Sequence, residues 1–239
     1  MAGAPQPALS IVVPCFNEEK RLPRTIEQIE RYLAGKGTQY ELILVDDGST
    51  DGTRKIMDTA ARRSRRVRIQ ALPLNRGKGR ALAEGVAAAV GSEILVTDAD
   101  LSTPIEELGK LQAELAKGAG VAIASRALRD SRVEVSQPIY RVLMGKVFNL
   151  LVQVVLLPGI WDTQCGFKLF RADVAHDAFA KLTTDGFGYD PEVLYRAKQR
   201  GVRIAEVPVI WRNSAPTKVS PIKSSLDMFR HILRVRFRR

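Results

Sequence analysis

The chain has 239 residues, 45% of them hydrophobic, and a formal net charge of +11. This length suits one α/β domain with a sizeable core. Its two cysteines, Cys15 and Cys165, are far apart and form no CxxC pair, which argues against a disulfide framework or a zinc site and favours a reducing compartment. The surplus of positive charge predicts an anionic partner: a nucleotide, a nucleic acid or an acidic membrane surface.

Strands and helices are expected to alternate from the N-terminus to residue 126. Apolar runs rich in β-branched residues predict buried strands, and apolar residues at helical spacing predict the helices between them. This order predicts an α/β fold, an open and mostly parallel sheet with helices on both faces, in a single domain over 1–239. The predicted strands lie in 9–18, 40–53 (where the strand runs into a turn), 68–74, 93–100 and 120–126, and the predicted helices in 24–34, 53–64, 77–90 and 104–118.

Polar residues gather where these strands end. The segments "FNE", "DDGSTDGT", "TDADLS" and "SR" each follow an apolar run. The carboxyl ends of parallel strands share one edge of a sheet, and ligands of open α/β proteins bind in the crevice beyond that edge. We therefore expect the functional site there.

Two aspartates, Asp98 and Asp100, follow a predicted strand with one small residue between them. Such carboxylates repel each other unless a cation neutralises them, and at this spacing both can meet one divalent ion. Asp46 and Asp47 end another strand, where a carboxylate can bind a ribose or a base, and the basic, glycine-containing segment 75–81 suits an anion. Each feature alone is also typical of a turn. Together they predict a site for a diphosphate and a metal ion.

Two further segments, 138–158 and 220–239, depart from this pattern. In the first, one polar residue recurs every four positions on a broadly apolar surface, and Arg141 and Lys146 make it a poor membrane span. The pattern fits either a buried core helix or a helix that faces a lipid or a bilayer interface. The second segment is a predicted basic tail helix, since 217–239 holds seven Arg and Lys residues against one Asp.

Four motifs in order resemble the signature of family 2 glycosyltransferases: "IVVPCFNEE", "LVDDGSTDGT", "NRGKGRAL" and "VTDADLSTP". That resemblance implies a GT-A fold, a nucleotide-sugar donor and a divalent metal. Three later blocks narrow it to the polyprenyl-phosphate hexosyltransferases, among which the dolichyl-phosphate β-glucosyltransferases and their bacterial relatives are most similar: "DTQCGFKLF", "GFGYDPEVLYRA" and "EVPVIWRNSAPTKV". The resemblance covers roughly residues 8–220.

Roles for the donor and metal sites follow from this resemblance. The metal, Mg²⁺ or Mn²⁺, would be bound by Asp98 and Asp100, with Ser102 where some relatives have a glutamine. The base, ribose and diphosphate would be bound by residues at the strand ends, namely Pro14, Phe16, Glu18, Asp46, Asp47, Lys78, Asp98, Ala99 and Arg126.

The resemblance also implies an acceptor side. Arg212 and Lys218 would engage phosphate, and Asp190 would act as a base or orient the acceptor or the sugar; the same aspartate also fits a helix cap. Asp162 is expected to hold a loop, and Lys168 to reach a phosphate.

The implied reaction transfers a hexose, first of all glucose from UDP-glucose, to a polyprenyl or dolichyl phosphate with inversion to a β-linked product. The N-terminus lacks the features of a signal peptide, so a cytoplasmic enzyme associated peripherally with the cytoplasmic face of a membrane is expected. GDP-mannose as donor, a soluble acceptor, and a non-catalytic nucleotide-sugar-binding protein stay open. Nucleic-acid binding is disfavoured, because no strand interleaves aromatic with basic residues.

Overall fold

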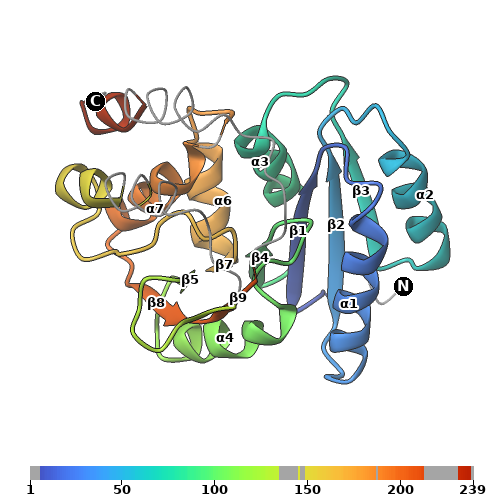
Figure 1. Cartoon of the computed structure of the whole chain (residues 1–239), viewed down its shortest axis with the longest axis horizontal. Coiled ribbons are helices and arrows are strands. Elements are labelled where there is room, and N and C mark those ends of the chain that lie inside the picture. Colours follow the sequence, from blue (N-terminus) through green and yellow to red (C-terminus); the bar gives the residue numbers. More distant parts are fainter. Residues whose placement is uncertain (1–5, 135–144, 146–148, 187, 213–230, 238–239) are drawn as a thin grey trace.

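The computed structural model of the chain describes residues 6–134, 145, 149–186, 188–212 and 231–237. Its centre is a seven-stranded sheet with the strand order β3-β2-β1-β4-β7-β5-β8 (Figure 1). β6 (Arg132–Val133) pairs with β9 (Ile210–Trp211) in a separate two-stranded sheet. The strands of the large sheet are β1 (Leu9–Cys15), β2 (Tyr40–Asp46), β3 (Val67–Ala71), β4 (Glu93–Val96), β5 (Val121–Ser125), β7 (Lys168–Arg171) and β8 (Ile204–Pro208).

The predicted α/β class and mostly parallel sheet are confirmed. All neighbouring strands of the large sheet run parallel except at β7, which lies antiparallel between β4 and β5. β7 was not among the predicted strands, because its four residues, KLFR, are too short to show a period. Its insertion brings the loop that precedes it to the end of β4.

Helices cover both faces of the sheet. α1, α2 and α4 pack on one face and α3, α6 and α7 on the other, each contributing to a separate apolar cluster. Residues 149–155 and 231–237 are also helical and join the second face. The bounds are α1 (Leu22–Ala34), α2 (Thr53–Arg63), α3 (Lys78–Ala88), a 3₁₀ turn (Ile105–Glu107), α4 (Leu108–Ala116), α6 (Ala172–Ala180) and α7 (Tyr189–Gln199).

Side chains of the central strands alternate between the two clusters. In β1, Ile11 and Val13 face α1, α2 and α4, whereas Val12 lies in the cluster of the opposite face. All three are fully buried, as expected for parallel strands covered on both sides. The chain therefore needs continuous apolar runs here, and the polar residues come where the strands end.

The strand order places the predicted site residues together. From β1 the chain continues to β2 and β3 on one side of it and then crosses to β4 on the other side, so the strand order reverses at β1. Cys15, at the end of β1, pairs with Asp46 at the end of β2. Ligands of open α/β folds bind at such a switch point. The loops after β1, β2 and β4 meet there.

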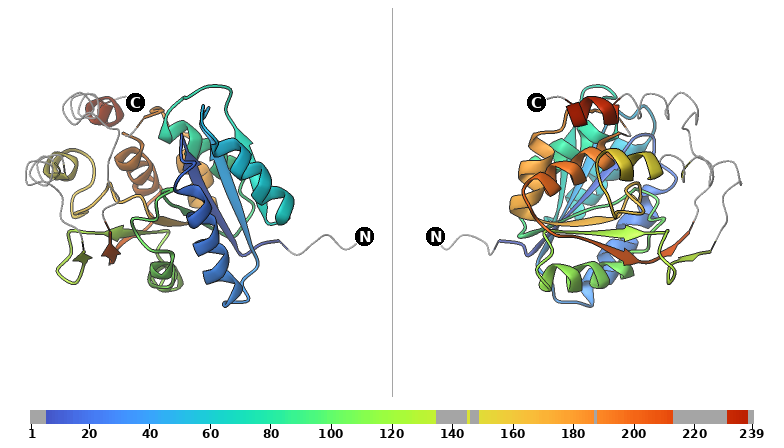
Figure 2. Two further views of the ribbon diagram at one scale, coloured as in Figure 1. Left: turned by 45° about the vertical axis from the view of Figure 1, so that its right-hand side comes forward. Right: turned by 90° about the vertical axis from the view of Figure 1, so that its left-hand side faces the viewer.

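Only part of the predicted helix over 138–158 is described. Within its helical part, Val152 is buried, whereas Leu150 and Val154 are 61% and 74% exposed. Helix 231–237 likewise buries one face and leaves Phe237 75% exposed; Figure 2 shows both helices on the side of the molecule away from β3. Among the described residues, no helix has the length and apolar character needed to cross a bilayer.

Candidate active site

The loop after β1 is bonded to the loop after β2. The Asn17 side-chain oxygen accepts the Thr50 N–H at 2.8 Å, and the Glu18 N–H donates to Thr53 Oγ1 at 2.7 Å. Asn17 has a left-handed backbone, with φ of 56°, a conformation that asparagine adopts more readily than most residues. These bonds hold Phe16, which is 37% exposed at the sheet edge where the base pocket was predicted.

Arg21 connects the loop after β1 to the loop after β4. Its guanidinium donates two hydrogen bonds of 2.6 Å to the Glu18 carboxylate, and its Nη1 lies 4.0 Å from Asp100 Oδ2. Pro14, half-buried within β1, precedes this network. Glu18 is thus oriented by an arginine that sequence reasoning missed, because i,i+3 pairs are common on ordinary helix entries.

Asp46 and Asp47 organise the backbone of their own loop and of the next one. Asp46 Oδ1 accepts the Ser49 N–H at 2.9 Å. Asp47 accepts the N–H groups of Arg76 and Gly77 at 2.8 and 2.9 Å, one on each oxygen. Both aspartates are buried. Asp47 therefore fixes the glycine loop that begins α3, and each of its oxygens keeps a lone pair for a further donor.

Lys78, the first residue of α3, forms an ion pair with Asp98 at the end of β4. Gly166, in the loop before β7, lies so close that a Cβ atom placed on it would be 2.0 Å from Asp98 Oδ2. Burial acts to raise the pKa of Asp98, but the charge and hydrogen bond of Lys78 outweigh it, so the pKa is lowered and the carboxylate is ionised at neutral pH.

The segment after Asp98 turns sharply. Asp100 Oδ1 accepts the Ser102 N–H at 2.9 Å, and Leu101 between them has a φ of 45°. Such a backbone costs about 1–3 kcal/mol in a residue with a branched side chain and is concentrated at functional sites. The Ser102 carbonyl accepts the Arg212 N–H at 2.7 Å, which brings the end of β9 to this turn. Ala99 is buried beneath it.

Arg126, which follows β5, is held by a buried carboxylate. Its Nε and Nη2 donate to the two oxygens of Asp162 at 2.7 and 2.9 Å, and its guanidinium lies 5.3 Å from the centre of the Trp211 ring. Glu206 fixes Asp162 in turn by accepting the N–H groups of Trp161 and Asp162. Asp162 holds its loop as expected, and in addition it orients the arginine.

Lys168 and Asp190 form a second ion pair, buried next to the first. The Lys168 ammonium also donates to the Cys165 carbonyl at 2.6 Å. Tyr189 lies between the two lysines, with the Lys78 and Lys168 ammonium groups 5.5 and 5.8 Å from its ring centre. Burial, together with the Asp190 and Asp98 carboxylates, raises the pKa of Tyr189 well above its usual value, so the phenol is neutral.

The residues predicted for the acceptor side lie in different surroundings from one another. Lys168, expected to reach a phosphate, is fully buried and occupied by Asp190. Asp190 lies in the first turn of α7, whose N-cap position is occupied by Gly188, and its carboxylate pairs with Lys168. The Arg212 side chain is 57% exposed and pairs with Glu134 at 2.8 Å. Lys218 lies outside the described residues.

The structure brings most of the predicted donor and metal residues to one edge of the sheet, with cations interleaved among the acids. Sequence reasoning missed Arg21, Gly166 and Tyr189. Of these, only Tyr189 is adjacent in sequence to a predicted site residue, Asp190. Arg21 and Gly166 act through contacts that no local sequence pattern reveals. The predicted residues that form hydrogen bonds or ion pairs of their own in this region are Glu18, Asp46, Asp47, Lys78, Asp98, Asp100, Ser102, Arg126 and Asp190.

The chemistry of this corner fits a divalent cation. Asp98, Asp100 and Ser102 offer the oxygen ligands that Mg²⁺ and Mn²⁺ prefer, and an ammonium group already lies against Asp98. Across the described part of the chain, no three His, Cys, Asp or Glu side chains are grouped to hold a metal by themselves. Such a set suits an ion that takes its remaining ligands from phosphates and water.

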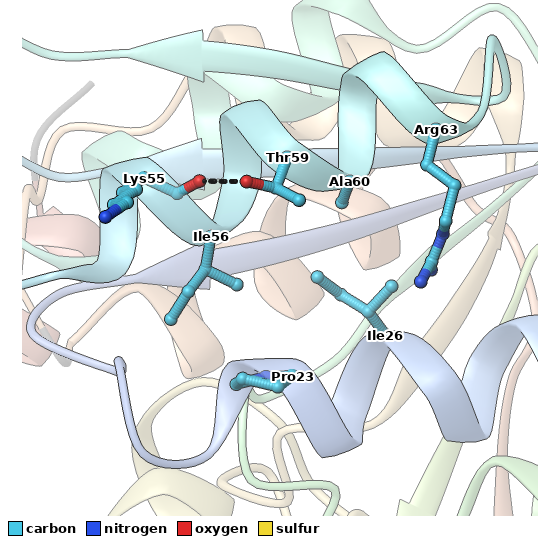
Figure 3. Close-up of a pocket in the computed structure, with 7 residues that line it drawn as sticks. All are labelled: Pro23, Ile26, Lys55, Ile56, Thr59, Ala60 and Arg63. Atoms are coloured by element: carbon cyan, nitrogen blue, oxygen red, sulfur yellow. Dashed lines mark hydrogen bonds between the residues drawn. The ribbon is translucent and has the colours of Figure 1, made fainter.

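A separate groove of about 340 Å³ lies between α1 and α2. Figure 3 shows the apolar Ile26 and Ile56 in it, with Lys55 and Arg63 at its rim. It contains none of the predicted site residues, so we assign it no part in the active site.

Comparison with known proteins identifies the family. Residues 10–179 match the family model for Glycosyl transferase family 2. The chain is 36% identical to the human dolichyl-phosphate beta-glucosyltransferase over 98% of this chain and 76% of that protein. It is 34% identical to the protein of the same name from Dictyostelium discoideum, over 96% of this chain and 74% of that one.

Solved structures agree on the fold. Glucosyl-3-phosphoglycerate synthase from Mycobacterium tuberculosis, in complex with Mn²⁺, UDP and glucosyl-3-phosphoglycerate, superposes with a TM-score of 0.71 at 20% identity, covering 96% of this chain and 78% of that one. The family match spans most of the chain, and the sheet order and helix layers agree with it. The chain therefore belongs to glycosyl transferase family 2, adopts the GT-A fold and is a glycosyltransferase.

Proposed function

We propose that this enzyme transfers glucose from UDP-glucose to a polyprenyl phosphate, in one metal-dependent displacement that inverts the anomeric centre. The similarity of at least 34% over nearly the whole chain to two proteins named dolichyl-phosphate beta-glucosyltransferase supports the sugar and the acceptor class. The observation that carries the proposal is the alternation of acids and cations at one sheet edge, where Lys78 and Arg126 can receive a diphosphate and Asp98 can hold its metal ion.

In the donor site, the base would lie near Pro14 and Phe16, with Glu18, Asp46 and Asp47 toward the base and ribose. Lys78 and Arg126 would contact the diphosphate. Arg126 is suited to bidentate binding of phosphate oxygens, since Asp162 fixes its plane. Lys78, at the start of α3, already pairs with Asp98. Its ammonium group would then donate both to Asp98 and to the bound diphosphate, without a large movement of α3.

Asp98 and Asp100 would hold Mg²⁺ or Mn²⁺, with Ser102 contributing its hydroxyl or a bound water. Bound there, the ion would neutralise the negative charge that develops on the departing diphosphate. Lys78 and Arg126 would act in the same direction, as fixed cations in a partly buried site where electrostatic interactions are stronger than in water.

The acceptor needs little activation. A phosphate monoester has a second pKa of about 6, so it is largely dianionic at neutral pH and can attack the anomeric carbon without a strong base. The protein's task is then to position the acceptor and to keep water away. We assign Asp190 to orienting the acceptor or the sugar from its buried place beside Tyr189, and Arg212 and Lys218 to the acceptor phosphate.

The lipid part of the acceptor would lie at a membrane surface on its cytoplasmic side. The exposed Leu150, Val154 and Phe237 offer apolar contacts, and the basic residues over 217–239 offer attraction to anionic lipid of about 1 kcal/mol each near the surface. Peripheral association of this kind keeps the active site close to a lipid phosphate.

A radiolabelled-donor assay with organic extraction tests the proposal. UDP-glucose with polyprenyl phosphate and Mg²⁺ or Mn²⁺ should give an extractable product whose anomeric coupling in NMR is that of a β-linkage. If the labelled glucose is instead transferred to a phosphorylated soluble acceptor, and the labelled product stays in the aqueous phase, the lipid acceptor is refuted. Transfer from GDP-mannose but not from UDP-glucose would refute the donor.

A further inference from the structure

His231 attaches helix 231–237 to α7. Its Nε2 lies 2.7 Å from Glu192 Oε2, and both residues are buried, Glu192 completely. Ile232 and Val235 of the same helix enter the apolar cluster that includes α7. Figures 1 and 2 show this helix beside α7 at the C-terminal end of the described chain. A polar contact thus stands inside an otherwise apolar helix interface.

Glu192 connects this contact to a loop. Its other oxygen, Oε1, accepts both the N–H and the hydroxyl of Thr183 at 3.0 Å, and Arg196 Nη2 at 3.2 Å. Burial acts to raise the pKa of Glu192, but the bonds from His231 and Thr183 lower it overall. The carboxylate is therefore ionised and accepts from every partner, so the His231 Nε2 carries the proton.

The loop that Glu192 holds packs against the glycine loop that carries Lys78. A Cβ on Gly77 would lie 2.5 Å from the Asp185 carbonyl oxygen, and one on Gly79 would lie 2.7 Å from the Thr184 carbonyl oxygen. The Arg80 N–H, in the first turn of α3, donates to the same Asp185 carbonyl at 3.2 Å. The backbone at 184–185 therefore forms one wall of the Lys78 position.

Gly188 shows how closely His231 approaches the active site. A Cβ on this glycine would lie 3.2 Å from the His231 ring, and the glycine directly precedes Tyr189 and Asp190. The imidazole thus lies against the first turn of α7, between helix 231–237 and the two residues that meet Lys78 and Lys168.

We propose that His231 is a positioning residue of this glycosyltransferase. Through Glu192 it fixes the loop at 183–186 and the start of α7, and so keeps Lys78 and Asp190 in the places where donor and acceptor meet. This coupling needs only the hydrogen bond that the His231 Nε2–H donates to Glu192, and it does not depend on the charge of the imidazole ring. The catalytic consequence rests on the function proposed above, whereas the structural coupling does not.

Hydrogen exchange of the full chain tests the coupling without any substrate. His231→Leu removes the donor and leaves a buried carboxylate short of one partner, whereas His231→Gln keeps an N–H near the same place. We expect amide exchange across 183–190 to become about 10-fold faster in the leucine variant and to stay within about twofold of wild type in the glutamine variant. His176→Leu is the matched control, since His176 is the other histidine of the chain and lies partly exposed on α6.

Turnover should be impaired in the same variants as hydrogen exchange. We expect kcat per folded molecule to fall about 10-fold in His231→Leu, to recover with His231→Gln and to be unchanged in His176→Leu. Unchanged exchange at 183–190 in His231→Leu would overturn the proposal, as would a glutamine variant as defective as the leucine variant, because packing rather than the hydrogen bond would then be responsible. A wild-type chain without transfer activity would refute the proposed function and leave the exchange result to decide the coupling.

Discussion

Asp98 lies so close to Gly166 that residue 166 has no room for a side chain. A Cβ atom at this position would lie 2.0 Å from Oδ2 and 2.6 Å from Cγ of the aspartate. The contact joins two segments almost seventy residues apart, because β7 inserts antiparallel next to β4. The loop before β7 thereby lies against the carboxylate that Lys78 also contacts.

We expect Gly166→Ala to displace the Asp98 carboxylate and to lower turnover by about 100-fold or more, since a displacement of about 1 Å at a reacting centre has a cost of that size. The measurement is kcat with UDP-glucose and polyprenyl phosphate. Gly35→Ala serves as the control, because its added Cβ would meet nothing closer than 3.8 Å. Wild-type turnover in Gly166→Ala would mean that the position of Asp98 does not matter.

Removing the partner of Arg126 should show in the pH dependence of stability. Burial acts to raise the pKa of Asp162, but Arg126 outweighs it and the net pKa is lowered. A carboxyl with a depressed folded pKa stabilises the protein fully above its unfolded pKa of about 3.9, and this contribution is lost as the pH falls through the folded value.

We therefore expect Asp162→Asn to lower the free energy of unfolding by about 3 kcal/mol at pH 7 and at pH 5 alike, as for other broken buried pairs. Below about pH 4 the difference from wild type should shrink, because the wild-type carboxyl also loses its charge. Urea unfolding at pH 7, 5, 4 and 3 measures this. A difference that grows on acidification would contradict the assignment of the pair.

Lys168 and Asp190 allow structure to be separated from catalysis. Asp190→Leu alone leaves a buried ammonium without its partner and should destabilise the fold by about 3–5 kcal/mol. The double variant Lys168→Met/Asp190→Leu removes both charges and should recover most of that stability, since apolar replacements of buried pairs are often neutral.

Turnover of the double variant then reports on Asp190. We expect it to stay at least about 100-fold below wild type, the size of loss expected when a reacting group is misplaced by about 1 Å. Thermal unfolding confirms that the variant is folded, and the extraction assay gives its rate. A folded double variant with full activity would reduce Asp190 to a structural residue.

The exposed apolar residues of helix 149–155 should contribute to membrane binding. Leu150→Ser/Val154→Ser removes two side chains that are 61% and 74% exposed, and burial of such side chains contributes about 1.5–3 kcal/mol each. We expect at least about a 10-fold weaker partition onto anionic vesicles. Val90→Ser, at an exposed valine two residues after α3, is the control. Equal partition of all three proteins would exclude this helix from the membrane contact.

Much of the fold could be predicted from local pattern. Continuous apolar runs such as 9–15 predict strands buried on both faces, and the polar residues that follow them predict the functional edge. Asp98 and Asp100 follow β4 as predicted, although they lie in the turn after Val96 rather than in the strand. The boundaries shifted inward, for example from 93–100 to Glu93–Val96, because the predicted range included the polar residues after Val96, which make no ladder pairs.

The remainder depended on contacts between distant segments. β7 is too short to be recognised from the sequence. The contact between Gly166 and Asp98 depends on β7, so it could not be predicted either. Lys168 is expected from the sequence to reach a phosphate, yet the antiparallel strand carries it into the interior, where only a buried partner such as Asp190 makes its charge tolerable. Neither position follows from residue spacing.

Metal-dependent UDP binding tests the central claim most directly. Calorimetric titration of UDP, with Mn²⁺ present and absent, should show tighter binding with the metal in the wild type and no metal effect in Asp100→Ala, whose partly exposed side chain can be removed without loss of the fold. Asp58→Ala, which removes an exposed pair with Arg54 on α2, should behave as wild type. The same metal dependence in Asp100→Ala as in the wild type would contradict a diphosphate and metal site at Asp98 and Asp100.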